Sequence, residues 1–284
     1  MRTVYLNGDY IPESEATVSI FDRGFLFADG VYEVTTVVDG KLIGFDGHCE
    51  RLKRSLKELG MKVEIDRDEM LEIHRELVTR NNIDQGMIYL QITRGNPGDR
   101  DFAFPPQDTK PTIVLFSQEK QVVGTAVEKQ GLRVVSVDDL RWGRRDIKTV
   151  QLLYPSLAKM EAKAKGADDA WLVQDGFVTE GTSNNAYIVK GGKIITRDLS
   201  HDILHGITRK SVLACAKFLQ MEVEERPFTL EEAYAADEAF STSASGFTNP
   251  IVEIDGHTIG VGKPGPVVDR LRGLYLEENM KAAM

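Results

Sequence analysis

The sequence predicts an α+β protein with two domains. Its 284 residues exceed the size of a typical single domain, which is about 150 residues. Strand-like runs joined by Asn-Gly, Asp-Gly and Gly-Gly pairs occur in both halves, and such pairs favour hairpin turns. Strands dominate the second half, but stretches with apolar residues at helical spacing flank them, which favours α+β over an all-β fold.

We predict a smaller α+β domain over residues 1–118. The Asn-Gly and Asp-Gly pairs in this part stand between apolar runs and indicate two hairpins. Leucines at helical spacing indicate a helix that Gly60 ends, and a second helix carries His74 on its apolar face. The predicted elements are hairpins over 3–11 and 30–45, helices over 46–60 and 66–82, and strands over 87–95 and 111–118.

We expect residues 119–131 to be a linker and residues 132–284 to form a larger second domain. Thr229 and Glu232 match a capping box at a helix start, and Pro155 suits the first turn of another helix. The predicted elements are strands over 132–137, 168–174, 177–180, 185–197 and 237–245, and helices near 155–165, 206–220, 229–236 and 266–280.

The composition argues against several classes of protein. A net charge of −9 opposes a nucleic-acid partner, because phosphate binding depends on clustered Lys and Arg. No apolar run approaches the roughly 18 residues that suggest a membrane helix, and the N-terminus turns polar too early for a secretory signal. The five histidines lack metal-site spacing, so we expect no metal. Cys49 and Cys215 are far apart and fit a reduced cytoplasm, which is the location we expect.

Two short motifs indicate little by themselves. Residues 260–265, GVGKPG, match GxGxxG, but they follow a hairpin and open no βαβ unit, so a glycine-rich turn is the simpler interpretation. Ser156 and Lys159 match the SxxK pattern of penicillin-recognising serine enzymes, whose other two motifs are not found here. A serine hydrolase therefore stays a minor alternative.

Lys148 lies in the stretch RRDIKTVQLLYPSLAK, residues 144–159, ahead of an apolar run. On a strand it would share a face with Asp146 and Val150. A lone lysine is most often exposed, with its ammonium group extended to solvent. In a partly dry pocket, however, a neutral lysine amine acts as a nucleophile and base and bonds to an aldehyde cofactor. The surrounding sequence has to distinguish a surface lysine from a cofactor-binding lysine.

Several other stretches could supply the remaining contacts of a pyridoxal cofactor. Glu180 stands at a strand end before a Gly-, Ser- and Asn-rich turn, where an acid could meet the ring nitrogen. Residues 206–208 start a helix, whose amides suit a phosphate. Arg51 could bind the phosphate with its fork of donors, and STSAS, residues 241–245, supplies hydroxyls. Each has a plain structural explanation, and only the combination favours a cofactor site.

The motifs FDRGFLFADGVYEV, HCERL, TRG, DIKTVQLL, VTEGTSNN and LHGITR occur in this order over most of the chain. Their combination resembles the fold-type IV pyridoxal-phosphate aminotransferases, which include D-amino acid transaminases, branched-chain aminotransferases and aminodeoxychorismate lyases. FADGVYEV, QITRG, RWGRRDIKTVQLL and FTLEEA are most similar to the D-amino acid transaminases. The implied fold has two domains, and the larger C-terminal one binds the cofactor in mixed, barrel-like sheets with flanking helices.

The resemblance implies pyridoxal 5′-phosphate as the cofactor and a role for each candidate residue. Lys148 would be the Schiff-base lysine and proton shuttle, and Glu180 would pair with the protonated ring nitrogen. The substrates would be a small-molecule amino donor and a keto acid. The chain would form a homodimer in which the loop near Arg100 reaches the neighbouring site. The other implied contacts are Arg51, Gly206, Ile207, Thr208, Ser243, Ala244 and Ser245 for the phosphate, Leu204 for the ring face, and Tyr32, Arg100 and Phe102 for the substrate.

One substitution departs from the family pattern. Many D-specific members bind the α-carboxylate with an Arg-x-His pair on this loop, whereas here Arg100 is followed by Phe102 in RDFAFP. Phe102 could instead face an apolar substrate side chain. Arg100 alone, or another arginine such as Arg23 or Arg144, would then bind the carboxylate.

These expectations lead to one main function. We predict a transaminase that moves an amino group from a D-amino acid, such as D-alanine or D-glutamate, to pyruvate or 2-oxoglutarate. An (R)-selective amine transaminase is an alternative, because Phe102 replaces the family histidine. A branched-chain L-amino acid aminotransferase, an aminodeoxychorismate lyase and a non-catalytic pyridoxal-binding protein are further alternatives.

Overall fold

The computed structural model describes residues 1–284, which form two compact units. Unit 1 contains residues 1–123, 147–151 and 282–284, and unit 2 contains residues 124–146 and 152–281. Short segments from the middle and the end of the chain therefore complete a unit that is otherwise made from the N-terminal part.

The two units differ in three places from the domain boundaries that we expected from the sequence, 1–118 and 132–284, and one of them is that residues 282–284 belong to unit 1. Residues 147–151 belong to unit 1, because their backbone is hydrogen-bonded to a strand of that unit. The expected linker at 119–131 contains a short helix, α4 (Ala126–Gln130), which begins with a capping box made by Thr125 and Glu128.

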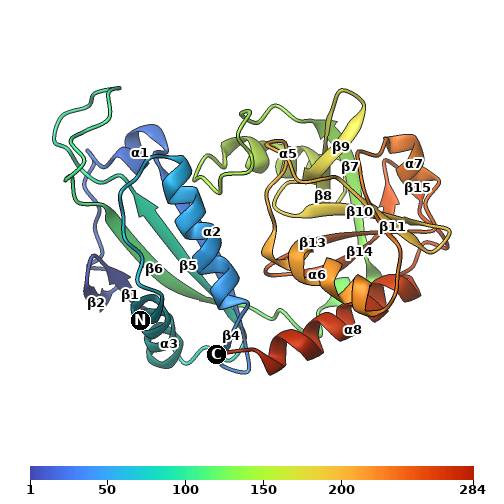
Figure 1. Ribbon diagram of the computed structural model, residues 1–284, viewed down its shortest axis with the longest axis horizontal. Helices are drawn as coiled ribbons and strands as arrows, with labels where there is room; N and C mark the ends of the chain where they lie inside the picture. Colours follow the sequence, from blue (N-terminus) through green and yellow to red (C-terminus); the bar gives the residue numbers. More distant parts are fainter. The chain divides into compact units, whose positions relative to one another are not determined.

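Unit 1 is built on a six-stranded antiparallel sheet with the order β2-β1-β6-β5-β3-β4 (Figure 1). The predicted hairpin turns are confirmed, since Asn7 and Asp39 adopt φ angles of 53° and 50°. Such left-handed backbone is tolerated best by Gly, Asn and Asp. The strands are β1 (Thr3–Leu6), β2 (Asp9–Pro12), β3 (Gly30–Val38), β4 (Lys41–Ile43), β5 (Gly86–Thr93) and β6 (Thr112–Glu119).

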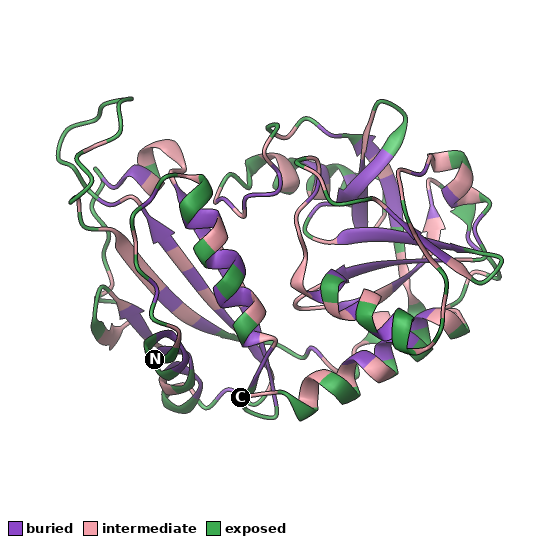
Figure 2. Cartoon of the chain, in the orientation of Figure 1, coloured by how far each residue is buried: buried purple, intermediate pink, exposed green.

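Two helices pack against this sheet, α2 (Phe45–Glu58) and α3 (Arg67–Arg80). Their apolar stripes are buried, as the purple bands in Figure 2 show. Leu52, Leu56 and Leu77, which recur at the predicted helical spacing, are each at most 3% exposed. The chain terminus returns to this core, where Met284 exchanges backbone hydrogen bonds with Leu42.

Unit 2 contains a nine-stranded mixed sheet with the order β12-β11-β10-β13-β14-β7-β8-β9, and β15 pairs with β14. Three pairs are parallel, namely β11 with β12, β14 with β7, and β7 with β8. The sheet curls, because a short turn joins β9 at one end to β10 near the other. The strands are β7 (Leu132–Asp138), β8 (Asp169–Gln174), β9 (Phe177–Gly181), β10 (Asn185–Lys190), β11 (Lys193–Thr196), β12 (Val223–Glu225), β13 (Glu238–Ser243), β14 (Phe247–Ile254) and β15 (His257–Thr258).

Helices flank this sheet, so the predicted α+β class is confirmed. Helix α5 packs against β7 and β8, while α6 and α8 pack on each other and on β13 (Figure 1). None of the helices is both long and apolar enough to span a membrane. The remaining helices are α1 (Arg23–Phe27), α5 (Leu153–Ala164), α6 (Ile207–Phe218), α7 (Leu230–Tyr234) and α8 (Pro266–Lys281).

The buried His74 makes the stability of unit 1 depend on pH. Its Nδ1 lies 2.7 Å from the carbonyl oxygen of Met70, and its ring packs edge-on against Phe45. Burial lowers the pKa of His74 to about 4. The unfolded chain, in which this pKa is about 6.5, therefore binds the proton first, and stability falls as the pH drops from about 6.5 to about 4.

We expect His74→Phe to remove this loss, which is on the order of 3 kcal/mol at about 1.4 kcal/mol for each pKa unit. The measurement is urea unfolding of both proteins at pH 7 and pH 4.5. Leu77→Val, on the same helix, is a control whose cost in stability should be equal at both pH values. An unchanged pH dependence in the His74 variant would contradict the prediction.

Candidate active site

Lys148 is fixed to the edge of the unit 1 sheet. Its carbonyl oxygen accepts a hydrogen bond from Tyr32 N at 3.0 Å, and Val150 N donates to the carbonyl oxygen of Gly30 at 3.1 Å. A single bridge joins Thr149 to β3, so the expected strand is reduced to this short contact. The backbone position of Lys148 is therefore set by β3, although most of its neighbours in sequence belong to unit 2.

The side chain of Lys148 is half-buried over an aromatic surface. Its Nζ lies 3.9 Å from the centre of the Tyr32 ring, which stacks on Tyr89, and Tyr89 stacks on Phe116. Burial raises the pKa of Tyr89 to about 12, so this phenol stays neutral and donates to Gln91. The rings restrict the long lysine side chain and keep its amine beside a rigid apolar wall.

Arg51 forms a buried ion pair with Glu33 on the neighbouring strand β3. Its Nε and Nη2 donate to the two carboxylate oxygens at 2.8 and 2.7 Å, which is the bidentate geometry. Nδ1 of His48 lies 2.7 Å from the same carboxylate. Ser55, one turn beyond Arg51, accepts from Lys148 N at 3.4 Å. One stripe of α2 thus holds both Glu33 and the Lys148 segment.

The surroundings of Glu33 and His48 determine which of these two side chains is charged. Burial alone would raise the pKa of Glu33, but Arg51 and the hydrogen bonds from Arg51 and His48 lower it to about 2. Burial lowers the pKa of His48. The neutral imidazole then donates to a permanently ionised Glu33, and the cluster carries one positive and one negative charge.

The arginines expected to bind a carboxylate have different surroundings. Arg23 is buried and donates to Asp29 and to the carbonyl oxygens of Asp101 and Ala103, so it holds the loop after β5 in place. Arg144 pairs with Asp146. Arg100 is exposed on the loop, and its contacts are with two phenylalanine rings.

In unit 2, Glu180 is buried at the end of β9, 3% exposed. Its two carboxyl oxygens accept hydrogen bonds from Arg141 Nη1 at 2.6 Å and Asn185 Nδ2 at 2.9 Å, and they share the single N–H of Leu204 at 3.0 and 3.2 Å. Burial raises the pKa of Glu180, whereas Arg141 and the Leu204 amide act against this rise. These donors surround the oxygens of Glu180 and stabilise its carboxylate form.

Arg141 is a site residue that the sequence reasoning missed. Its Nε and Nη2 bind Asp139, whose Oδ2 also accepts from Thr179. Although burial opposes it, Glu180 and Asp139 raise the pKa of Arg141 further above its usual range. Arg141 lies in the run RWGRRDIK, where nothing in the sequence distinguishes it from Arg145, which donates to Gln174 and lies 3.5 Å from Asp139 but does not reach Glu180.

The start of α6 lacks a side-chain cap. Gly206 is the N-cap residue and no side chain bonds to the amides of the first turn. A Cβ atom at Gly206 would lie 2.2 Å from Oδ1 of Asn185, so only glycine fits beside that amide. Thr208 in the first turn is buried.

The predicted Ser243–Ser245 stretch is a turn at the end of β13. Ser243 Oγ accepts from Gly246 N at 3.1 Å and closes the turn. Arg272 of α8 donates to the carbonyl oxygens of Gly246 and Thr248 at 2.9 and 3.0 Å. These bonds hold Phe247, whose φ of 56° is unusual for a bulky residue. Arg272 is therefore a second residue that the sequence did not indicate.

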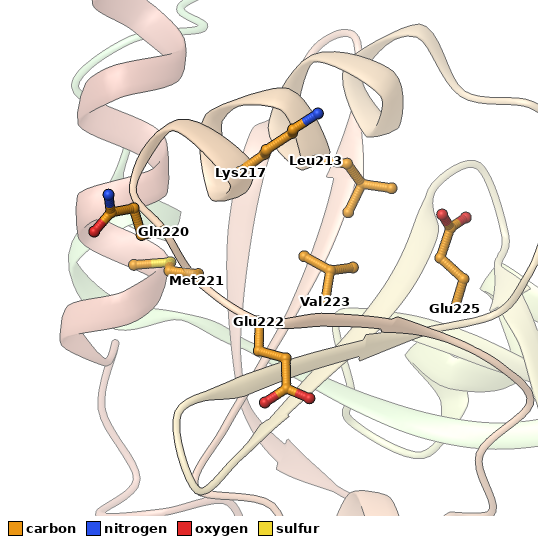
Figure 3. Close-up of a pocket in the computed structure, with 7 residues that line it drawn as sticks. All are labelled: Leu213, Lys217, Gln220, Met221, Glu222, Val223 and Glu225. Atoms are coloured by element: carbon orange, nitrogen blue, oxygen red, sulfur yellow. The ribbon is translucent and has the colours of Figure 1, made fainter.

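Three other features give no support for a second site. Ser156 donates to the carbonyl oxygen of Leu152, and Lys159 lies 3.2 Å from Asp169, so this pair is engaged elsewhere. No group of His, Cys, Asp and Glu is arranged to hold a metal. A hollow beside the end of α6 contains no candidate residue (Figure 3). Its lining residues are Leu213, Lys217, Gln220, Met221, Glu222, Val223 and Glu225.

Comparison with known proteins identifies the family. The family model of amino-transferase class IV matches residues 30–254. The chain is a class IV aminotransferase. It is 38% identical to D-alanine aminotransferase of Staphylococcus aureus (strain MSSA476) and 39% identical to D-alanine aminotransferase of Staphylococcus haemolyticus, each over 96% of both chains.

A solved structure agrees with this assignment. The branched-chain amino acid aminotransferase of T.th. with pyridoxamine 5′-phosphate matches with a TM-score of 0.90 and 28% identity, over 100% of this chain and 98% of that one. The predicted fold-type IV architecture is therefore confirmed. The aminotransferase contains Lys148 in one unit and Glu180 in the other, each with a buried, charged supporting network.

Replacing Glu33 should destabilise the aminotransferase, because it leaves a buried guanidinium without its counter-ion. We expect Glu33→Gln to cost about 3–5 kcal/mol of unfolding free energy at pH 7. The contribution of Glu33 is complete above about pH 4.5 and is lost as the pH falls through about 2. Denaturant unfolding measures the cost. Glu72→Gln, on the exposed side of α3, is the matched control and should change stability by about 0.5 kcal/mol at most. Equal effects of the two variants would show that the prediction is wrong.

Proposed function

We propose that this aminotransferase uses pyridoxal 5′-phosphate to move an amino group from a D-amino acid, of the D-alanine or D-glutamate type, to pyruvate or 2-oxoglutarate. The observation that carries the proposal is the Lys148 amine, half-buried and 3.9 Å from the Tyr32 ring centre. A positioned amine beside an apolar wall is what nucleophilic attack on an aldehyde needs.

Sequence similarity favours the D-amino acid interpretation. The relatives named D-alanine aminotransferase are 38–39% identical to this chain, whereas the branched-chain enzyme is 28% identical. The second candidate is a branched-chain L-amino acid aminotransferase, which the TM-score of 0.90 supports. Backbone similarity alone is a weaker argument for substrate choice, because one fold serves many substrates.

The residues present fit the cofactor. Pyridoxal phosphate supplies an aldehyde carbon and a ring that accepts electrons. Lys148 would bond to that carbon through Nζ, and after its release would carry the proton that leaves the substrate Cα. Glu180 would hold the ring nitrogen in its protonated form. Leu204, whose amide is tied to Glu180, would pack on the ring face.

The phosphate would be bound by neutral and cationic donors together. We propose Arg51, the Ile207 and Thr208 amides at the uncapped start of α6, and the turn around Ser243, with Ala244 and Ser245 contributing backbone. The absence of a Gly206 side chain lets Asn185 pack against the start of α6. Tyr32, Arg100 and Phe102 would contact the substrate.

The Arg141–Glu180 pair gives the proposed site its charge balance. A buried carboxylate is costly unless it has a cationic or donor partner. Arg141 at 2.6 Å supplies the cation and offsets part of the cost of ionising the buried Glu180. We also propose a homodimer in which the loop near Arg100 reaches the neighbouring site, and a cytoplasmic location.

Lys148→Ala should abolish transamination and the visible absorbance of bound cofactor. Borohydride treatment of the unaltered holoenzyme should add the mass of the reduced cofactor at Lys148, and the variant should gain none. Lys159→Ala is the matched control and should behave as the unaltered chain does. Retained turnover and labelling in the Lys148 variant would defeat the proposal, and labelling of the unaltered chain by a β-lactam would revive the serine hydrolase alternative.

The donor preference is tested separately. Purified enzyme is incubated with pyruvate and either D- or L-glutamate, and alanine formation is followed by chromatography. We expect the D-donor to be preferred by at least about tenfold, which corresponds to about 1.4 kcal/mol in transition-state binding. Exclusive use of the L-donor would instead support the branched-chain candidate.

A further inference from the structure

The side-chain amide of Asn185 joins two segments of unit 2 that are far apart in the sequence. Asn185 is 4% exposed and is the first residue of β10. Its Nδ2 donates to Oε2 of Glu180 and to the carbonyl oxygen of Leu204, at 2.9 Å in each case. A primary amide nitrogen carries two N–H groups, so both donors are used. Glu180 belongs to β9, and Leu204 lies in the loop before α6 (Figure 1).

These contacts close a ring of hydrogen bonds. The N–H of Leu204 is shared by the two carboxyl oxygens of Glu180, at 3.0 and 3.2 Å. The Glu180 carboxylate, the Asn185 amide and the Leu204 backbone therefore each contact the other two. Leu204 is held through both its N–H and its carbonyl group. Because a buried polar group is costly to leave unpaired, each member of the ring restrains the others.

The same amide also packs against the start of α6. Gly206, the N-cap residue of this helix, follows Leu204 by two residues. A Cβ atom at Gly206 would lie 2.2 Å from Oδ1 of Asn185, so the amide and the glycine backbone are in close contact. One side chain thus meets the acid of β9, the loop and the first residue of the helix. All of these residues belong to unit 2, so their spacing is set within that unit.

We propose that Asn185 is a positioning residue that holds Glu180 and the first turn of α6 at one separation, which matches the two ends of pyridoxal 5′-phosphate. This inference rests on the proposed function, in which Glu180 meets the ring nitrogen and the α6 amides meet the phosphate. A ligand with two ends gains affinity over its separate parts only when both binding partners are already at the right distance.

The chemistry of asparagine suits this task. Its side chain is short and uncharged, and it offers two donors to the two acceptors, the Glu180 carboxylate and the Leu204 carbonyl oxygen. A serine or threonine hydroxyl has one donor, and an ionised aspartate has none. A lysine or arginine would add a second cation beside Arg141, which already pairs with Glu180.

The experiment measures how strongly the two ends of the cofactor are coupled. The full chain, freed of bound cofactor, is titrated separately with pyridoxal 5′-phosphate, with pyridoxal and with inorganic phosphate. The product of the Kd values for pyridoxal and phosphate, divided by the Kd for pyridoxal 5′-phosphate, is the effective concentration of one end when the other is bound. We expect Asn185→Ala to lower this effective concentration at least about tenfold, because the two binding partners are no longer held at one distance.

Asn184→Ala is the matched control. Asn184 is the preceding residue, and its Nδ2 donates to the buried Asp169 at 2.9 Å, so this variant also removes a hydrogen bond to a buried carboxylate, but outside the ring. Its effective concentration should stay within about twofold of the unaltered value. Asn185→Thr suits a strand and keeps one donor, which cannot serve both acceptors. It should behave as Asn185→Ala does, and it provides the test if the alanine variant does not fold.

A second measurement needs no cofactor. Hydrogen exchange of the backbone amides in residues 200–206 is followed by mass spectrometry in the chain freed of cofactor. The Leu204 amide should exchange several-fold faster in the Asn185 variants than in the unaltered chain, and Asn184→Ala should not change its rate. Equal exchange in all of these proteins, or an unchanged effective concentration in the Asn185 variants, would overturn the inference. Failure of the proposed function would appear instead as no binding of pyridoxal 5′-phosphate to the unaltered chain, with the exchange difference still present.

Discussion

The buried carboxylate of Glu33 is the constraint on which the arrangement of unit 1 depends. It is 3% exposed, between β3 and α2, and removing it from water is costly unless its charge is compensated. Arg51 and His48 supply that compensation from one face of α2. The helix therefore has one register against the strand. The same register sets Ser55 beside Lys148 N, so the helix that carries Arg51 also supports the backbone of Lys148.

Unit 2 also contains a buried carboxylate whose charge is compensated by an arginine. Glu180 is buried and paired with Arg141, which is itself held by Asp139. Each member of this chain of charges fixes the next, because an unpaired charge at these depths would be destabilising. A carboxylate held in this way moves little, which favours a residue that has to meet one defined atom of a ligand.

The arginines show how environment assigns roles to identical side chains. Arg23 and Arg272 donate to backbone carbonyl oxygens and hold loops in place. Arg51 and Arg141 balance buried acids. Arg100 contacts ring faces and is exposed. Phe102, which departs from the family pattern, contacts Arg100 through its ring.

The sequence by itself determined the local structure and the family. Local signals act over a few residues, so they can be recognised in the sequence without knowledge of the tertiary structure. Examples are the tight-turn pair at Asp39, the capping box of Thr229 and Glu232, and the leucines at helical spacing. The family motifs likewise named Lys148 and Glu180 as candidates.

Only the tertiary structure decided which charged residues are buried together. Glu33 and Arg51 are 18 residues apart on different elements, and Arg141 and Glu180 are 39 apart. The segment of Lys148 joins β3 more than a hundred residues away, in a unit to which its neighbours in sequence do not belong. The alternation of side chains along a strand places Tyr32 and Glu33 on opposite faces of β3, but it does not indicate which helix residue meets the acid. Pairing of charges depends on proximity in space and on the exclusion of water, and neither is set by any short-range pattern in the chain.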